Sequence, residues 1–370
     1  MNAVISQSDV ATAYGWGLDA LWNGLMSGQT AIRATQQFAE RGFLSDQVAV
    51  IEDLEPERGE SRALAAIRRI LSPVVGGIDP MTPLIVASTV GEIEFVERAI
   101  LGGDSSLIAE SRPLALVERV KRLMGLRGPA MVMSSACASS AAALTRAASM
   151  VRHGEAASVL VVSCDSVSEF VYSGFSTLMS LSAGPAKPFD AERSGLTLGE
   201  AVAWALVTAG GEGLSILGWG NTTDAVHMTA PDRNAGGLSR AIGKAVAMSE
   251  RSQGEIGVIA AHGTGTIYSD AMEMTAFRDR FETPRPVFSV KGGVGHTLAA
   301  AGLVQILVAG RAMARGHAPP TVGLSNVDES AGGWARGSPV DLGVSRLGLS
   351  TNSGFGGVNT AIMLGGGISG

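Results

Sequence analysis

Residues 130–144 read AMVMSSACASSAAAL, and residues 286–302 read PVFSVKGGVGHTLAAAG. Each segment begins with a short apolar run typical of a buried strand, turns through small residues and continues into an Ala-rich stretch of helical length. Each turn also carries one reactive side chain, Cys137 in the first and His296 in the second. The similarity suggests an internal duplication whose equivalent positions face one cleft. Because Ala-rich helices after strands are common, an unduplicated fold stays open at this point.

Similar apolar, β-branched runs recur along the chain between glycine or polar residues. We expect buried strands at 84–87, 130–133, 158–162, 202–207, 256–260 and 287–290. Helical stretches are expected at 138–153, 237–249, 270–280 and 298–315. Strands that alternate with helices form parallel βαβ units. The sequence therefore predicts a layered α/β fold whose strands are buried on both faces.

The composition indicates a globular protein with a large core. Of 370 residues, 46% are hydrophobic and only 17% charged, which excludes disorder as the main state. A net charge of −6 gives no general basic field, so we expect neither nucleic acid nor an anionic membrane as a partner. The first residues lack the features of a signal peptide, and the apolar stretch 298–310 is too short to span a bilayer. We expect a cytoplasmic protein.

Cys137 and Cys164 are the only cysteines, which excludes a disulfide framework and a multi-cysteine metal site. Cys137 lies between an expected strand and an expected helix, where the helix dipole favours a thiolate and therefore a nucleophile. The alternative is a small buried core cysteine. Cys164 follows an expected strand without such a helix start, and we interpret it as structural.

Two of the five histidines stand in glycine- and threonine-rich turns after expected strands. His262 lies in AAHGTGT, and His296 lies in VKGGVGHTLAAAG with Lys291 five residues before it. Open α/β sheets bind ligands at such strand ends, although a satisfied core histidine is the usual alternative. Neutral imidazoles can donate a hydrogen bond to a developing oxyanion. The motif GxxxxGK[ST] is absent, and so is GxGxxG after a first strand, so a nucleotide site is not expected.

The C-terminal segment TNSGFGGVNT places three glycines around Phe355. We interpret it as a mobile turn that brings a backbone N–H and an aromatic ring to a site. An ordinary glycine turn is the alternative.

These segments, in this order, resemble the β-ketoacyl-[acyl carrier protein] synthases, the decarboxylating condensing enzymes of the thiolase superfamily. The resemblance extends over about residues 16–364 and rests on six motifs: SSACASS (134–140), KPFDAERSGLTLGE (187–200), TTDAVHMTAP (222–231), AHGTGT (261–266), VKGGVGHTLAAAG (290–302) and NSGFGG (352–357). It implies the thiolase-like fold, in which duplicated βαβαβαββ halves form a layered αβαβα architecture. We expect the halves at 1–210, with the cysteine, and at 211–370, with the two histidines.

The resemblance implies roles for the residues of the expected cleft. Cys137 is the expected acyl-accepting nucleophile, and His262 and His296 are expected to bind the thioester oxygen of the extender during decarboxylation. Lys291 is expected to order the site. The resemblance implies no metal and no organic cofactor, because the substrates are carried on the phosphopantetheine arm of acyl carrier protein.

The remaining implied roles concern the entrance. Thr264 and Thr266 correspond to threonines that hydrogen-bond the phosphopantetheine arm. Phe355 corresponds to a gating phenylalanine whose backbone N–H joins that of Cys137 in an oxyanion hole. Asp224 falls in a loop that moves with this gate in relatives. Lys187 is the leading candidate for docking the acidic carrier protein, with Arg58 and Arg62 as weaker ones.

Some positions depart from the family pattern. Gln305 replaces a glutamate that pairs with the lysine in many relatives, Ser353 replaces a frequent phenylalanine, and the segment 182–189 is shorter than in many relatives. GTGTIYSDAME (263–273) replaces the commoner GTxTxxGD. These departures put the charge state of Lys291 and the shape of the acyl tunnel in doubt, and they favour a specialised branch such as the aryl-polyene-like synthases.

The leading functional hypothesis is a decarboxylative Claisen condensation of a Cys137-bound acyl group with malonyl-carrier protein, in fatty-acid or polyketide biosynthesis. The alternative is a non-elongating, chain-length-factor-like partner subunit, although such subunits have typically lost the cysteine. A degradative thiolase would need a second active-site cysteine near the C-terminus, and none lies beyond Cys164. We expect acyl carrier protein as a partner and a dimer, formed either with a second copy or with a sister subunit.

Overall fold

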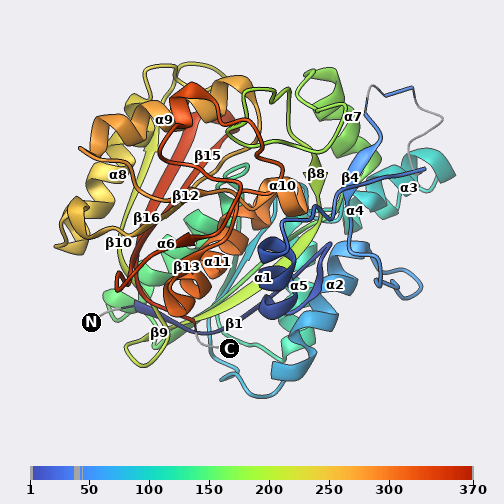
Figure 1. Cartoon of the computed structure of the whole chain (residues 1–370). Coiled ribbons are helices and arrows are strands. Elements are labelled where there is room, and N and C mark those ends of the chain that lie inside the picture. Colours follow the sequence, from blue (N-terminus) through green and yellow to red (C-terminus); the bar gives the residue numbers. More distant parts are fainter. Residues whose placement is uncertain (1–2, 37–41, 44, 369–370) are drawn as a thin grey trace.

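A long mixed sheet runs through the whole protein in the computed structural model, which describes residues 3–36, 42–43 and 45–368 (Figure 1). Its strands follow the order β12 (Val287–Phe288), β11 (Val258–Ala260), β15 (Leu347–Gly354), β16 (Val358–Gly366), β10 (Leu214–Thr223), β1 (Ala3–Thr12), β9 (Ala201–Ala209), β7 (Ser158–Asp165), β5 (Leu84–Ala87) and β6 (Ala130–Met133). β2 (Gly15–Trp16) pairs with β1.

The sheet contains the same strand arrangement twice. In the first copy β5 is parallel to β6 and β7, and β9 is antiparallel to both β7 and β1. In the second copy β11 is parallel to β12 and β15, and β16 is antiparallel to both β15 and β10. The antiparallel pair of β1 and β10 joins the copies. This repeated order confirms the expected duplication.

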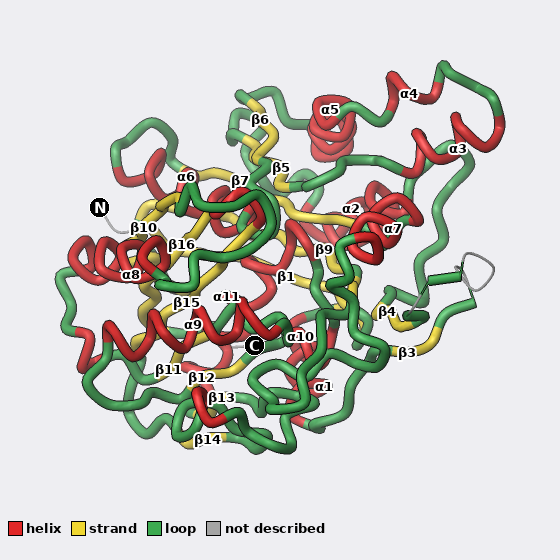
Figure 2. Tube along the Cα trace, turned by 90° about the horizontal axis from the view of Figure 1, so that it is seen from above, coloured by secondary structure: helices red, strands yellow, loops and turns green. Residues whose placement is uncertain are grey.

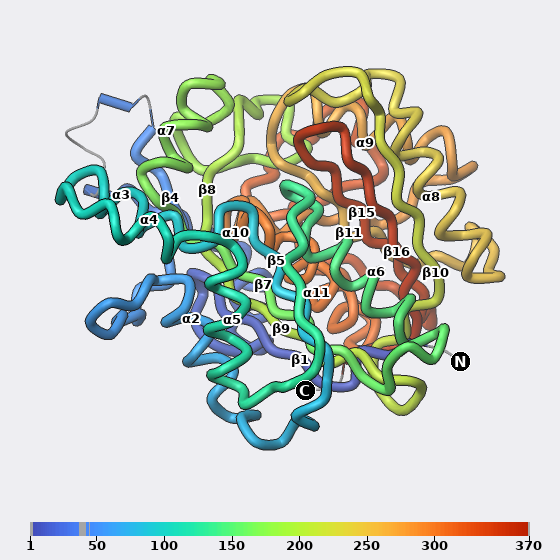
Figure 3. The backbone as a smooth tube through the Cα atoms, turned by 180° about the vertical axis from the view of Figure 1, so that it is seen from behind, coloured from blue at the N-terminus to red at the C-terminus, as the bar shows by residue number. Residues whose placement is uncertain are grey.

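Helices cover both faces of the sheet and fill the space between the two copies. The middle layer holds α6 (Ser139–Arg152) and α11 (Ala301–Arg315), which pack against each other and against both copies. One outer layer holds α2 (Arg62–Leu71) and α5 (Pro113–Met124), and the other holds α8 (Gly236–Ser249) and α9 (Ile267–Arg280). Figure 3 shows these outer pairs on opposite sides of the molecule. The result is the expected αβαβα architecture.

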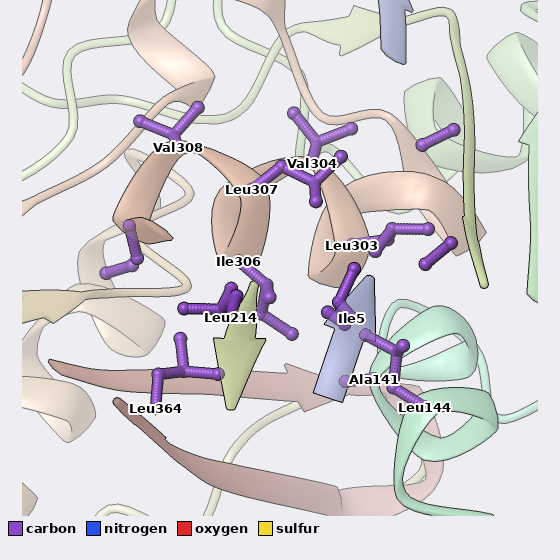
Figure 4. Packing of buried hydrophobic residues seen from close by; sticks show 14 of the residues in the cluster. Ile5, Ala141, Leu144, Leu214, Leu303, Val304, Ile306, Leu307, Val308 and Leu364 are labelled. Carbon is purple, nitrogen blue, oxygen red and sulfur yellow. The ribbon is translucent and has the colours of Figure 1, made fainter. Parts of the chain in front are cut away.

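The middle layer contains the largest apolar core. Figure 4 shows Leu303 and Ile306 of α11 above side chains of β1, β10 and β16, with Ala141 and Leu144 of α6 beside them. Every residue of α11 from Ala301 to Met313 is buried, Gln305 and Arg311 included, because both copies cover the helix. With the preceding turn it forms a helical stretch of 18 residues, Leu298–Arg315. By length and composition this stretch could cross a bilayer, contrary to our expectation, but nearly all of it is buried in the core of the protein.

The remaining elements surround this frame (Figure 2). The shorter helices are α1 (Leu18–Met26), α3 (Glu94–Gly102), α4 (Leu107–Glu110), α7 (Glu169–Thr177) and α10 (Lys291–Val294). Two small sheets are formed by β3 (Arg33–Ala34), β4 (Gln47–Ala49) and β8 (Leu198–Gly199), and by β13 (His317–Ala318) and β14 (Val340–Asp341).

Most expected strands exist, but the burial of β6 and the end of β7 differ from our expectation. All four side chains of β6 are only half-buried, because β6 is the last strand of the sheet and has a neighbour on one side only (Figure 2). β7 continues to Asp165, so Cys164 lies inside a strand rather than after it. β5 and β6 have the expected bounds, whereas β11 and β12 are shorter than expected.

Candidate active site

A cavity of about 310 Å³ opens where the strand ends of both copies meet. Its lining includes the expected residues Cys137, Asp224, His262, Thr264, Thr266, His296 and Phe355. Lys291 is buried behind His262, while Lys187 and Cys164 are not part of the lining. The fold therefore assembles residues that are up to 218 positions apart in the chain, between Cys137 and Phe355, around one space.

Cys137 lies in a tight turn between β6 and α6. Ser139 fixes the turn, because its Oγ accepts a hydrogen bond from the Ser135 N–H at 2.8 Å and donates one to the Ala136 carbonyl at 2.6 Å. Ala136 takes a left-handed conformation, with φ at 47°, and α6 begins two residues after the cysteine. This turn places the thiol at the cavity wall and close to the helix N-terminus, as the sequence predicts.

The protonation state of Cys137 differs from the expected thiolate. Burial raises the pKa of the thiol to about 11, while Lys291 and the backbone N–H groups of Phe355 and Cys137 favour the anion more weakly. Desolvation therefore outweighs the favourable charges, and the unloaded residue is a thiol at neutral pH.

The two histidines use the same ring nitrogen, Nδ1, for their contacts within the protein. His296 Nδ1 accepts a hydrogen bond from the Leu298 N–H at 3.2 Å. His262 Nδ1 lies 3.3 Å from Lys291 Nζ and 3.5 Å from Asn352 Nδ2, both of which are donors. Burial and the Lys291 charge hold both imidazole pKa values well below the usual range. Each ring is therefore neutral and carries its proton on Nε2.

Lys291 is held by His262 rather than by the residue at position 305. Its Nζ donates to the His262 carbonyl oxygen as well as approaching Nδ1. Burial lowers the Lys291 pKa, and the nearby carboxylate of Glu273 works in the opposite direction. Glu273 itself accepts hydrogen bonds from the N–H groups of His262 at 2.8 Å and Gly263 at 2.6 Å. Burial raises the pKa of Glu273 to about 7, and the carboxyl group closest in role to a partner of the lysine is therefore on α9.

Gln305 faces hydrogen-bond acceptors, which explains why this position holds an amide. Its Nε2 lies within hydrogen-bonding distance of the Ala260 carbonyl at 3.0 Å, the Thr351 carbonyl at 2.9 Å and Ser350 Oγ at 2.8 Å. Its Oε1 accepts from Asn352 Nδ2 at 3.3 Å. A carboxylate at this position would be repelled by the carbonyl oxygens of Ala260 and Thr351.

Sequence reasoning missed Glu273, Gln305 and Asn352 as a network around His262. A signal for Glu273 existed, since Asp270 and Glu273 are one helical turn apart and lie within seven residues after the AHGTGT motif. Asp270 accepts hydrogen bonds from the N–H groups of Thr264 at 3.0 Å and Gly265 at 3.1 Å. The two acidic residues together hold the backbone of the His262 turn.

The expected gate is the turn of the hairpin formed by β15 and β16. The Phe355 ring stacks on Phe175 of α7, with 5.6 Å between ring centroids. Asp224 is tied to the same turn, since its N–H donates to the Gly357 carbonyl at 2.8 Å and its Oδ1 accepts from Asn359 Nδ2 at 2.9 Å. The Asp224 loop and the Phe355 turn are therefore joined directly.

The candidates for carrier docking lie in different environments. Lys187 is exposed and pairs with Glu192 at 2.9 Å. Arg62 is half-buried, and its guanidinium is already engaged in a two-fold pair with the buried Glu200, at 2.7 and 3.0 Å. We therefore withdraw Arg62 as a docking candidate. Arg58 is exposed.

Comparison with known proteins identifies the family. Residues 104–210 match the N-terminal domain of beta-ketoacyl synthases, and residues 214–325 match the C-terminal domain. The 3-oxoacyl-[acyl-carrier-protein] synthase 2 of Mycobacterium tuberculosis is 32% identical over 64% of this chain, and the match spans 60% of that protein's length.

Two further relatives are similar over nearly the whole chain. The ketoacyl synthase alpha subunit of the tetracenomycin polyketide synthase from Streptomyces glaucescens is 28% identical, over 98% of this chain and 96% of its own. A ketosynthase solved in complex with its chain length factor, from Xenorhabdus doucetiae, has a TM-score of 0.86 and 26% identity over 98% of both chains. The matching domain pair and the shared fold establish that the chain belongs to the β-ketoacyl synthase family of the thiolase superfamily.

Proposed function

We propose that this protein is an elongating ketosynthase that joins a Cys137-bound acyl group to a malonyl unit on acyl carrier protein. The observation that carries the proposal is the pair of neutral, Nε2-protonated imidazoles, with ring centroids 5.4 Å apart, in one cavity with the Cys137 thiol. A partner subunit without turnover has no need of this combination.

In the first step the Cys137 sulfur attacks the carbonyl carbon of an acyl thioester. The carrier sulfur leaves with its bonding electrons and receives the proton that the cysteine gives up. The N–H groups of Cys137 and Phe355, which already face the sulfur, stabilise the negative charge on the carbonyl oxygen. The acyl group is then held as a thioester that remains electrophilic.

In the second step malonyl-carrier protein loses carbon dioxide, and the electrons of the broken carbon–carbon bond form an enolate. His262 and His296 donate their Nε2 protons in hydrogen bonds to the enolate oxygen. One such donor contributes about 2.7 to 4 kcal/mol in other enzymes. The enolate carbon then attacks the acyl carbonyl, and the Cys137 sulfur leaves and regains a proton. No metal or organic cofactor takes part in this scheme.

Intact-protein mass spectrometry tests the proposal directly. The wild type, offered acyl-carrier proteins of different chain length, gains one acyl mass, and added malonyl-carrier protein removes it with release of a β-ketoacyl product. Cys137→Ala gains no mass. Acylation that persists in Cys137→Ala, or loading without any elongation, contradicts the proposal.

A dimer that uses the open edge of β6 is part of the same proposal. β6 ends the sheet and its side chains are half-exposed, whereas the outer edge of β12 is covered by hydrogen bonding between Val287 and Trp334. Exposed edge strands pair readily with another strand. Solved neighbours include ketosynthases in complex with a chain length factor, so the second subunit is either a copy of this chain or a sister protein. Light scattering of the protein expressed alone separates these cases, and an active monomer contradicts both.

A further inference from the structure

The segment from His262 to Tyr268 runs from the floor of the cavity to its mouth. His262 and Thr264 are only 3% and 4% exposed, whereas Ile267 and Tyr268 are 55% and 57% exposed, and all four line the cavity. Thr264 and Thr266 lie between these ends, with their hydroxyl oxygens 2.9 Å apart. A molecule that reaches Cys137 from solvent therefore passes Tyr268 early and His262 late.

Arg233 is an exposed residue that lies beside the outer end of this path. Its guanidinium carbon lies 4.8 Å from the centre of the Tyr268 ring, a cation–π arrangement that fixes the charge beside the mouth. The carboxylate of the adjacent Asp232 accepts hydrogen bonds from the N–H groups of Asn234 and Gly236. Among the residues described by the structure, no carboxylate forms an ion pair with Arg233.

The rest of this rim is largely apolar. Three residues that line the cavity, Leu178, Met179 and Ile267, are exposed hydrophobic side chains. A guanidinium that forms no ion pair is available to an anion, and arginine binds phosphate oxygens with two parallel hydrogen bonds. Tyr268 restricts the side chain, so less conformational freedom is lost when an anion binds.

We propose that Arg233, supported by Tyr268, binds the phosphate of the phosphopantetheine arm. The order of groups along the arm matches the order along the cavity. The thiol end of the arm must reach Cys137 and the histidines, its amide portion passes the threonines, and its single phosphodiester is at the carrier end, where Arg233 lies. Arg233 is thus a specificity residue that distinguishes phosphorylated from unphosphorylated forms of the arm. This inference rests on the proposed ketosynthase function.

The test compares two thioesters that differ in the phosphate alone, hexanoyl-4′-phosphopantetheine and hexanoyl-pantetheine. Loading of Cys137 is followed by mass spectrometry in wild type, Arg233→Gln and Arg251→Gln. Arg251 is an exposed arginine after the far end of α8, about 20 Å from the mouth by helix length, so its variant has the same change in net charge. Arg233→Gln should raise the KM for the phosphorylated thioester about tenfold and leave that for hexanoyl-pantetheine unchanged. Arg251→Gln should change neither.

Two further variants test the support by Tyr268. Tyr268→Phe keeps an aromatic face for the guanidinium and should behave as wild type. Tyr268→Ala should raise the KM for the phosphorylated thioester alone, by less than Arg233→Gln does. The same ranking is expected for acyl-carrier protein, with a weaker salt dependence in Arg233→Gln because one charge contact is lost.

A KM in Arg233→Gln that is unchanged for both thioesters, or raised equally for both, overturns the inference while the ketosynthase function stands. Failure of the wild type to load from either thioester or from acyl-carrier protein contradicts the proposed function instead. In that case titration of Cys137→Ala with 4′-phosphopantetheine still decides the inference, because binding that Arg233→Gln does not weaken excludes the phosphate contact.

Discussion

The backbone N–H of Leu298 donates a hydrogen bond to Nδ1 of His296, only two residues earlier in the chain, at 3.2 Å. Leu298 adopts the left-handed conformation, with φ at 49°, which is uncommon for leucine. Strain of this kind is typical of functional sites. Here the contact occupies Nδ1 and leaves the proton on Nε2, where it can be donated to substrate.

Loss of either imidazole donor, His262 or His296, should therefore impair decarboxylation of the malonyl group more than acylation of Cys137. In His262→Ala and His296→Ala we expect the release of carbon dioxide from malonyl-carrier protein to fall at least ~100-fold, while Cys137 still accepts some acyl group. The two steps are measured separately, as released carbon dioxide and as mass gain. His317→Ala, which alters an exposed histidine, is the control and should match wild type. Normal decarboxylation by a variant would remove that histidine from the proposed role.

The raised pKa of Cys137 predicts an unusual pH dependence of alkylation. With a thiol pKa of about 11, the thiolate fraction rises about tenfold per pH unit throughout the neutral and mildly alkaline range. We expect the rate of modification by iodoacetamide to rise in this way from pH 7 to 10 without levelling off. Cys137→Ala corrects for any reaction of Cys164. A plateau at or below pH 8.5 would show that the site favours the thiolate after all.

Replacement of Gln305 by glutamate should destabilise the protein. In Gln305→Glu a carboxylate would replace the amide that lies about 3 Å from the Ala260 and Thr351 carbonyl oxygens, at an expected cost of about 2 to 5 kcal/mol at pH 8. Because burial and these oxygens raise the pKa of the new carboxyl in the folded state, folding favours its protonated form. The loss of stability should therefore be smaller at pH 5 than at pH 8.

Denaturant unfolding of the wild type and the variant at both pH values measures this effect. Gln305→Met is the control, since it removes the hydrogen bonds without adding a charge and should lose the same free energy of unfolding at both pH values. Wild-type stability of Gln305→Glu at pH 8 would mean that the new carboxylate pairs with Lys291 instead of opposing the carbonyl groups.

Lys187 remains our candidate for docking the carrier protein. Its pairing with Glu192 is exposed, and such pairs contribute little, so its charge is available to an acidic partner. We expect Lys187→Glu to raise the KM for acyl-carrier protein several-fold and to weaken the salt dependence of KM, with little change in kcat. Arg251→Glu serves as the matched charge reversal. Equal values for both variants would place docking elsewhere.

The sequence predicts well those elements whose signal is local. β5 and β6 are uninterrupted apolar runs and have the expected bounds. β10 was missed because Gly218 and Gly220 interrupt its pattern, yet these glycines are required by close packing of α8. A Cβ atom at Gly218 would lie 2.4 Å from the Ala245 carbonyl oxygen, and one at Gly220 would lie 2.1 Å from that of Ala241. These glycines are required by α8, which follows β10 in the chain, so the pattern of the strand itself does not show why they are there.

The same distinction separates the predicted and missed parts of the site. Cys137, His262 and His296 each occupy a recognisable strand-to-helix turn, so the motifs identify them. Gln305 and Asn352 contact each other only because α11 packs against β15. They are 47 positions apart in the chain, and no sequence pattern predicts a contact at that separation. The depth at which Cys137 is buried also depends on segments far away in the chain. The sequence therefore predicts a lowered pKa for the thiol, whereas burial raises it.

The last prediction concerns the contact between the gate and the nucleophile turn. Gly354 takes an extended conformation that any residue can adopt, with φ at −126°. A Cβ atom there would nevertheless lie 3.1 Å from both the Cys137 nitrogen and the Ser135 carbonyl oxygen. Gly354→Ala should therefore fold normally but push the Phe355 turn away from Cys137. We expect the rate of acyl loading to fall about 10- to 100-fold, as small displacements of reacting groups do elsewhere.

The rate of loading and the midpoint of thermal unfolding together decide this prediction. Gly184→Ala is the matched control, because a Cβ atom at Gly184 meets no atom within 4 Å and its variant should load at the wild-type rate. If Gly354→Ala loads normally, the turn has room to adjust and the N–H of Phe355 is not held in place by this contact. If its unfolding midpoint falls by many degrees, the glycine serves the packing of the hairpin as a whole. A slow but stable variant is the outcome that assigns Gly354 to positioning the oxyanion hole.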